Sequence, residues 1–165
     1  MSWFRFAVLI IVATILQTSL IDIFAVTTAE VKPDLLLVLL VFFAVNFTST
    51  NVVITSFTIG FAADIISPTM GPHIISFGLF GTLLSDLHGI IDTRKWPYQS
   101  LAIFTVGFLT AAMAHLLMFL KAEPTLLNAY TKLFWTPLYS AIIGPFLFLP
   151  AELWMRTRRR RIRRF

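Results

Sequence analysis

The sequence predicts an all-α membrane protein, built as a single bundle of six transmembrane helices. Of its 165 residues, 58% are hydrophobic and 13% are charged, and the mean hydropathy is +0.85. A soluble domain carries about 25% charged residues, so this chain has too little polar surface to cover a soluble globule. Cysteine is absent, which excludes disulfides, thiolate metal sites and cysteine nucleophiles within this chain.

Six apolar segments approach the length of roughly 20 residues that a membrane helix needs. Their expected ranges are 3–23, 34–47, 51–66, 73–91, 96–120 and 134–155. They form a transmembrane domain over residues 1–155, followed by a polybasic cytoplasmic tail over residues 156–165. The first segment has a long apolar run with no clear cleavage site after it. This pattern favours a retained helix over a cleaved signal peptide.

The second and third segments are the hardest to separate, because residues 35–63 carry no charge. This run is too long for one ordinary span and short for two. The polar sequence Asn46-Phe-Thr-Ser-Thr-Asn51 in its middle is a turn signal. We therefore expect two short helices joined by a tight turn. The alternative is one long helix or a re-entrant segment.

Lysine and arginine are distributed unevenly between the two predicted sides of the membrane. If both termini face the cytoplasm, the inner side holds every basic residue except Lys32, Lys121 and Lys132. Cytoplasmic loops of membrane proteins carry an excess of basic residues. We therefore expect an even number of spans, with both termini in the cytoplasm.

The chain ends in a strongly basic segment that accounts for its net charge of +5. Seven of the 13 basic residues lie in the last ten positions: Arg156, Arg158, Arg159, Arg160, Arg161, Arg163 and Arg164. We expect this tail to fix topology on anionic lipid headgroups, since each basic residue near such a surface contributes about 1 kcal/mol. A docking site for an acidic cytoplasmic protein is the alternative. Because the charge is confined to the tail, we expect no nucleic-acid-binding face.

One carboxylate lies inside an otherwise apolar segment, Gly60-Phe-Ala-Ala-Asp64-Ile-Ile-Ser67-Pro68-Thr-Met-Gly71. A charge in hydrocarbon costs a few kcal/mol, so it is rarely kept without a partner or a function. The sequence favours a structural clamp, in which Asp64 accepts hydrogen bonds from backbone N–H groups that Pro68 and Gly71 leave free. A carboxylate that faces a partner or ligand, or one that couples to protons or ions, is the alternative. Gly60 lies one turn before Asp64 on the same helix face, where a small residue lets another helix approach.

The other ionisable residues within the spans form two groups. The outer group places His73 and His115 with Asp64, and the inner group contains Asp86, His88 and Glu152, near Arg94, Lys95 and Arg156. Carboxylates of the inner group are interpreted as solvated, or paired with basic side chains that reach the membrane surface. The chain has no His-Glu-x-x-His pair, no Gly-x-Ser-x-Gly elbow and no phosphate-binding loop. We therefore expect no catalytic residue, no metal site and no cofactor.

Together these features resemble the rod shape-determining protein MreD family, in length, in six apolar spans and in a basic C-terminus. Lys32-Pro33-Asp34 before Leu-Leu-Leu-Val-Leu-Leu resembles the basic-Pro-polar start of that family's second span. Gly60-x-x-x-Asp64-x-x-Ser67-x-x-x-Gly71 is similar to its signature at the third. The two motifs agree with the family in both order and spacing, which makes the resemblance specific.

The resemblance implies a non-enzymatic inner-membrane scaffold or regulator of the bacterial elongation machinery, which supports lateral peptidoglycan synthesis and rod shape. It implies association with the bitopic protein MreC. Through MreC it implies links to the MreB cytoskeleton, a SEDS-family glycosyltransferase and a penicillin-binding transpeptidase. The candidate residues for packing, partner contact or a pocket are Gly60, Asp64, Ser67 and Gly71.

The family is also similar in fold to the substrate-binding S components of energy-coupling-factor transporters. This similarity supplies the alternative function, a transport subunit that binds a small molecule. Such a subunit would need an outward-facing cavity lined by polar groups, for which the candidates are Asp64, His73, His115 and Asn128.

Overall fold

The computed structural model describes residues 3–19, 33–47, 49–67, 71–87, 96–121 and 129–155, and these form an all-helical protein. The helices are α1 (Trp3–Ser19), α2 (Leu35–Asn46), α3 (Ser49–Ile66), α4 (Pro72–Leu87), α5 (Trp96–Leu120) and α6 (Ala129–Met155). Among the described residues, three helices are long and apolar enough to cross a membrane: α3, α5 over Pro97–Leu120, and α6 over Leu133–Trp154. Helix α6 begins five residues earlier than its expected range.

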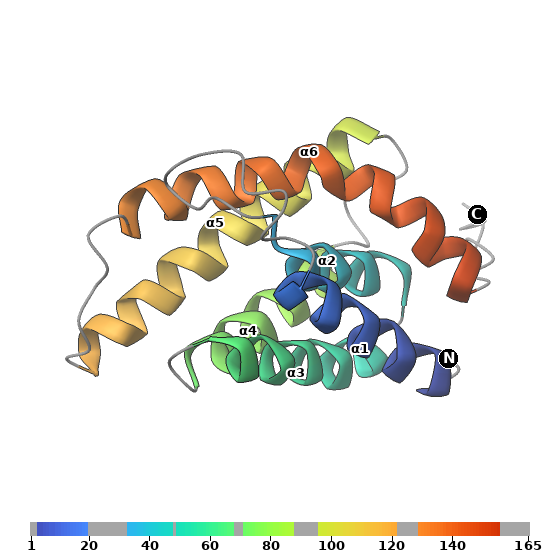
Figure 1. The fold of residues 1–165 in the computed structure, drawn as a ribbon, viewed down its shortest axis with the longest axis horizontal. Coiled ribbons are helices and arrows are strands. Elements are labelled where there is room, and N and C mark those ends of the chain that lie inside the picture. The colour runs from blue at the N-terminus through green and yellow to red at the C-terminus, as the bar shows by residue number, and fades with distance from the viewer. Residues whose placement is uncertain are drawn as a thin grey trace.

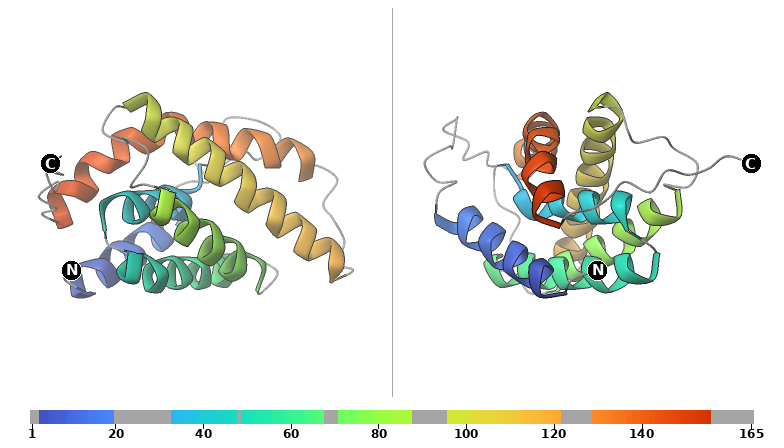
Figure 2. Two further views of the ribbon diagram at one scale, coloured as in Figure 1. Left: turned by 180° about the vertical axis from the view of Figure 1, so that it is seen from behind. Right: turned by 90° about the vertical axis from the view of Figure 1, so that its right-hand side faces the viewer.

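Helix α2 lies at the centre of the fold, with α5 and α6 on one side and α1, α3 and α4 on the other (Figures 1 and 2). It contacts each of the other five helices, and its residues 36 to 45 are all buried. A helix that is apolar on every face belongs in the interior. Its 12 residues extend about 18 Å, well short of a hydrocarbon core about 30 Å thick. Helix α2 is therefore a core helix around which the longer helices pack.

Aromatic side chains fix α2 against the two ends of the chain. The ring centroid of Phe43 lies 5.0 Å from that of Phe6 in α1, and the centroid of Phe42 lies 5.4 Å from that of Phe148 in α6. Both pairs are edge-to-face, the geometry that aromatic rings prefer. Helices α1 and α6 thus share one packing partner although they lie at opposite ends of the sequence.

The boundary between α2 and α3 follows the polar turn signal. Helix α2 ends at Asn46, and the backbone N–H of Phe47 still donates to the carbonyl of Phe43 at 3.1 Å. Helix α3 begins at Ser49, inside the polar run. The structure therefore has two helices here, in agreement with the interpretation preferred over one long helix.

The first turn of α1 and the last turn of α6 lie side by side. The indole N–H of Trp154 donates to the backbone carbonyl of Arg5 at 3.3 Å. Helix α6 contains three prolines, Pro137, Pro145 and Pro150, and it bends along its length (Figure 1). Proline removes an intrahelical hydrogen bond and is the usual cause of such bends.

Candidate functional site

The carboxylate of Asp64 holds the first turn of the neighbouring helix, α4. Asp64 is only 2% exposed. Its Oδ1 accepts from the backbone N–H of His73 at 3.0 Å, and its Oδ2 accepts from that of Ile74 at 2.9 Å. The first N–H groups of a helix lack partners within the helix, and an anionic group beside them is favourable. Asp64 therefore acts as an N-terminal cap that α3 supplies to α4.

Every backbone N–H group in this first turn of α4 has a partner. Pro72, the first residue of α4, has no N–H to satisfy. The N–H of Ile75 donates to the carbonyl of Gly71 at 3.4 Å, and the remaining two N–H groups bind Asp64. We refer to the contacts of Gly60 and Asp64 with the first turn of α4 as the α3–α4 clamp.

Gly60 makes the close approach of the two helices possible. A Cβ at this position would lie 2.8 Å from the carbonyl oxygen of His73 and 2.8 Å from the Cα of Ile74. Both are backbone atoms of α4, so any side chain at position 60 would push the first turn of α4 away. Gly60 is buried and lies one helical turn before Asp64. The glycine brings the two N–H groups within reach of the carboxylate.

The other two signature residues lie in the connection between α3 and α4. The N–H of Ser67 donates to the carbonyl of Ala63 at 3.0 Å and closes the end of α3. Gly71 has a backbone φ of +114°, a conformation that favours glycine, and the chain enters α4 directly after it. Pro68 lies outside the described residues. The described residues of the signature thus belong to one helical hairpin.

A second polar cluster, which the sequence did not predict, joins α1, α2 and α6. Oδ1 of Asp34 accepts from the N–H of Leu37 at 3.0 Å and from the side-chain amide of Gln17 at 3.2 Å. The amide oxygen of Gln17 accepts in turn from the N–H of Leu36 at 3.1 Å. Ser140 accepts from the N–H of Asp34 at 2.8 Å. We call this set the Asp34 cluster.

One part of the Asp34 cluster was visible in the sequence. An aspartate immediately before an apolar helix is an N-cap signal, and Asp34 caps α2 in this way. Gln17 and Ser140 lie 17 and 106 residues away in the sequence. No local pattern indicates which distant polar side chain completes a cap.

A cavity of about 210 Å³ lies between α2, α4, α5 and α6. Its polar lining comes from Asp34, His73, His115, Thr110 and Thr136. The alternative function of a transport subunit named His73 and His115 as candidates to line a cavity, and both line this one. Asp64 is not among its lining residues, because its carboxylate is turned toward the backbone of α4, and Asn128 lies outside the described residues. Asp34 is the carboxylate that lines this cavity, a role that the sequence offered for Asp64 only under the alternative function of a transport subunit.

The inner polar group is only partly described. Asp86 is exposed at the end of α4 and accepts from the hydroxyl of Ser49 at 3.5 Å. Glu152 lies half-buried on α6. His88, Arg94, Lys95 and the arginines of the tail lie outside the described residues.

The geometry of these groups suits helix assembly. Asp64, Gln17 and Asp34 all bind backbone N–H groups at helix starts. Ser140 donates to the carbonyl of Thr136 at 2.8 Å. Within the described ranges, no group of three or more His, Cys, Asp or Glu side chains could hold a metal ion. The buried polar side chains of both clusters fix where helices begin and which helices touch.

Comparison with known proteins gives a match to a protein family. The model of the family described as rod shape-determining protein MreD matches residues 1–158. This range contains all six helices and both polar clusters. No curated protein and no solved structure matches the chain.

Proposed function

The chain belongs to the MreD family of rod shape-determining proteins, and on that premise we propose that it is a non-enzymatic scaffold of the bacterial inner membrane that supports lateral peptidoglycan synthesis. The observation that carries this proposal is the family match over nearly the whole chain. The family determines rod shape and is not a known family of enzymes. The polar clusters support the same interpretation, because their side chains bind backbone groups of the protein itself.

The proposed direct partner is MreC, a protein with a single membrane span. Through MreC the scaffold would be linked to the MreB cytoskeleton, a SEDS-family glycosyltransferase and a penicillin-binding transpeptidase. Helices associate in a membrane through close packing and through satisfied polar groups. The α3–α4 clamp supports this role, because it holds two helices in a fixed relation and leaves a row of apolar side chains exposed on α3: Phe57, Phe61 and Ile65. We propose that the clamp shapes the surface on which MreC docks.

The proposed topology is multi-pass, with both ends of the chain in the cytoplasm. The contact between Trp154 and Arg5 supports it, since it brings the start of α1 and the end of α6 together. The seven arginines of the tail support a cytoplasmic side for these ends. We propose that the tail rests on anionic lipids there.

The test compares two carboxylates that differ in burial. Asp64→Ala removes the cap of α4, and Asp86→Ala makes the same chemical change at an exposed site. We expect Asp64→Ala to lower the yield of MreC per molecule of monodisperse protein and to round the cells. Asp86→Ala should leave both unchanged. Unchanged MreC yield and normal rod shape in Asp64→Ala would remove the clamp from the docking mechanism.

The second candidate is a small-molecule-binding subunit of a transporter related in fold to S components. The cavity lined by Asp34, His73 and His115 favours it. Its volume of about 210 Å³ lies below the range of about 300–1,000 Å³ typical of ligand pockets, which is why this function ranks second. Affinity purification in mild detergent distinguishes the two. MreC in the eluate supports the scaffold, and a transporter energising module with a bound small molecule supports the transporter.

A further inference from the structure

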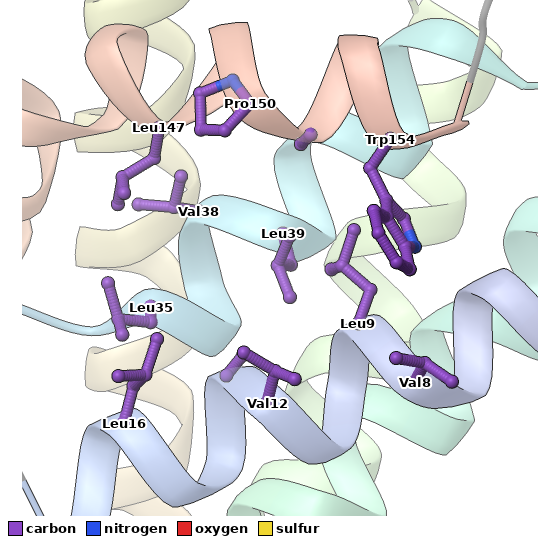
Figure 3. Close-up of a pocket in the computed structure, with 12 residues that line it drawn as sticks. Val8, Leu9, Val12, Leu16, Leu35, Val38, Leu39, Leu147, Pro150 and Trp154 are labelled. Atoms are coloured by element: carbon purple, nitrogen blue, oxygen red, sulfur yellow. The ribbon is translucent and has the colours of Figure 1, made fainter.

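An apolar groove lies between α1 and α6, with α2 as its floor (Figure 3). Its volume is about 330 Å³, and every residue that lines it is apolar. The side chains that define it are Val12 and Leu16 of α1, Val38 and Leu39 of α2, and Leu147 and Trp154 of α6. Val12 is 48% exposed and Trp154 is 51% exposed, so the groove opens at the surface of the protein.

The size of the groove decides what can fill it. An α-helix is about 10 Å across, so a volume of 330 Å³ corresponds to roughly 4 Å of helix, less than one turn. A whole helix therefore does not fit inside the groove, and only the side chains of a helix lying across it would enter. A void left there would forfeit the dispersion contacts of its walls. A flexible hydrocarbon chain is thin enough to restore these contacts along the groove.

A basic residue, Arg5, lies at one end of the groove, the end marked by Trp154 in Figure 3. Arg5 precedes Leu9 by four residues and Val12 by seven, so it lies on the face of α1 that forms the groove wall. The indole of Trp154 is hydrogen-bonded to the backbone of Arg5 at 3.3 Å. Helix α6 ends one residue later, at Met155, and the next ten positions contain seven arginines. Glu152 is the acidic residue in the last turn of α6, and residues 153–165 contain no other acidic residue.

We propose that this groove is a binding site for an anionic phospholipid. One acyl chain lies between α1 and α6 on the floor of α2. The phosphate-bearing headgroup lies at the Trp154 end, beside Arg5. This site goes beyond the scaffold function, since it requires neither MreC nor the α3–α4 clamp.

The test measures lipid retention by native mass spectrometry. The full chain in mild detergent is incubated with equal amounts of phosphatidylglycerol and phosphatidylcholine. We expect phosphatidylglycerol to be retained over phosphatidylcholine by about tenfold or more. Arg5→Gln should lower this ratio by about fivefold, the effect of one basic residue beside an anionic headgroup. Equal retention of the two lipids by the unmodified chain would overturn the proposal.

Two neighbouring residues on α1 provide a matched pair that tests the groove itself. Val12→Trp fills the groove, whereas Ile11→Trp adds the same side chain at a position that is 57% exposed and outside the groove lining. We expect Val12→Trp to lose most of the retained phosphatidylglycerol and Ile11→Trp to keep it. Equal retention by both variants would overturn the site. A loss of MreC rather than of lipid from Val12→Trp would assign the surface to a partner helix and also overturn it.

A second measurement does not depend on how Val12→Trp folds. In a chain carrying Trp3→Phe, Trp96→Phe and Trp135→Phe, Trp154 is the remaining tryptophan and can be excited selectively, at a wavelength beyond the absorption of tyrosine. Phosphatidylglycerol brominated on its acyl chain should quench this fluorescence more strongly than brominated phosphatidylcholine. Equal quenching by the two lipids, or no quenching, contradicts the proposal.

Discussion

Two aspartates begin helices in this protein, and they do so in different ways. Asp34 caps its own helix, with Oδ1 accepting from an N–H three residues ahead. Asp64 caps a helix to which it does not belong, through N–H groups nine and ten residues ahead. Asp34 is half-buried and lines a cavity, whereas Asp64 is 2% exposed. Similar chemistry therefore caps the residue's own helix at one site and the start of a neighbouring helix at the other.

The difference indicates which carboxylate can meet another molecule. Both carboxylate oxygens of Asp64 accept hydrogen bonds from backbone N–H groups of α4, so this side chain acts within the fold. Asp34 shares a cavity with two imidazoles, and its cap needs only Oδ1. The α3–α4 clamp and the cavity meet at His73, because its backbone N–H donates to Asp64 and the residue also lines the cavity. The α3–α4 clamp thus sets the position of a cavity residue.

The largest expected effect comes from making the same change at both aspartates. Asparagine has one acceptor oxygen and one amide donor. Asp64→Asn therefore leaves one N–H of α4 facing another donor, which we expect to cost about 2–4 kcal/mol in a site shielded from water. Asp34→Asn keeps the oxygen that the cap needs, and asparagine is as good an N-cap as aspartate, so the change should be below about 1 kcal/mol. Thermal unfolding of both variants in the same detergent measures the difference, and equal losses would break the comparison.

A smaller effect is expected from Gly60→Ala. The added Cβ would lie within contact distance of two backbone atoms of α4, and such overpacking costs about 1–3 kcal/mol. Because the displaced turn carries the N–H groups that bind Asp64, the double variant with Asp64→Asn should lose less than the sum of the two single losses. A double-mutant cycle measured by thermal unfolding checks this. Strict additivity would mean that Gly60 and Asp64 act on different features.

Local signals in the sequence predicted much of the fold. Apolar runs placed the six helices, and the polar run at 46–51 separated α2 from α3. The energetic cost of burying Asp64 indicated a structural clamp. The sequence could not indicate that the donor N–H groups belong to His73 and Ile74, since this depends on how closely α3 and α4 pack. Helix α6 starts at Ala129, before the predicted position 134, because residues 129–133, which the sequence predicted as part of a loop, are helical.

The Asp34 cluster shows why contacts between distant residues could not be predicted from the sequence. Ser140 meets Asp34 across 106 residues of sequence, and a serine in an apolar helix gives no indication of its partner. The pairing of His73 with His115 around one cavity is likewise set by the packing of α4 against α5. Asp64 lies inside an apolar segment, where burying a carboxylate is energetically costly and therefore conspicuous in the sequence. Asp34 lies at a helix start, where an aspartate is common. The energetic cost of burying a charge therefore identified Asp64, the structural carboxylate, from the sequence. Asp34, the carboxylate that lines the cavity, could be identified only from the structure.

The smallest expected effect tests how much the contact between Asp34 and Ser140 of α6 contributes to stability. Ser140→Ala removes the acceptor of the Asp34 N–H, which lies 2.8 Å from the Ser140 hydroxyl. Because that N–H is only half-buried, we expect a loss of about 1 kcal/mol. Ser85→Ala is the matched control, since its hydroxyl makes a weak contact of 3.5 Å with Ser49, and its unfolding temperature should not change. MreC yield should be normal in both variants, because neither touches the α3–α4 clamp. A loss in Ser140→Ala as large as that in Asp64→Asn would mean that the contact of Asp34 with α6 contributes as much to stability as the α3–α4 clamp.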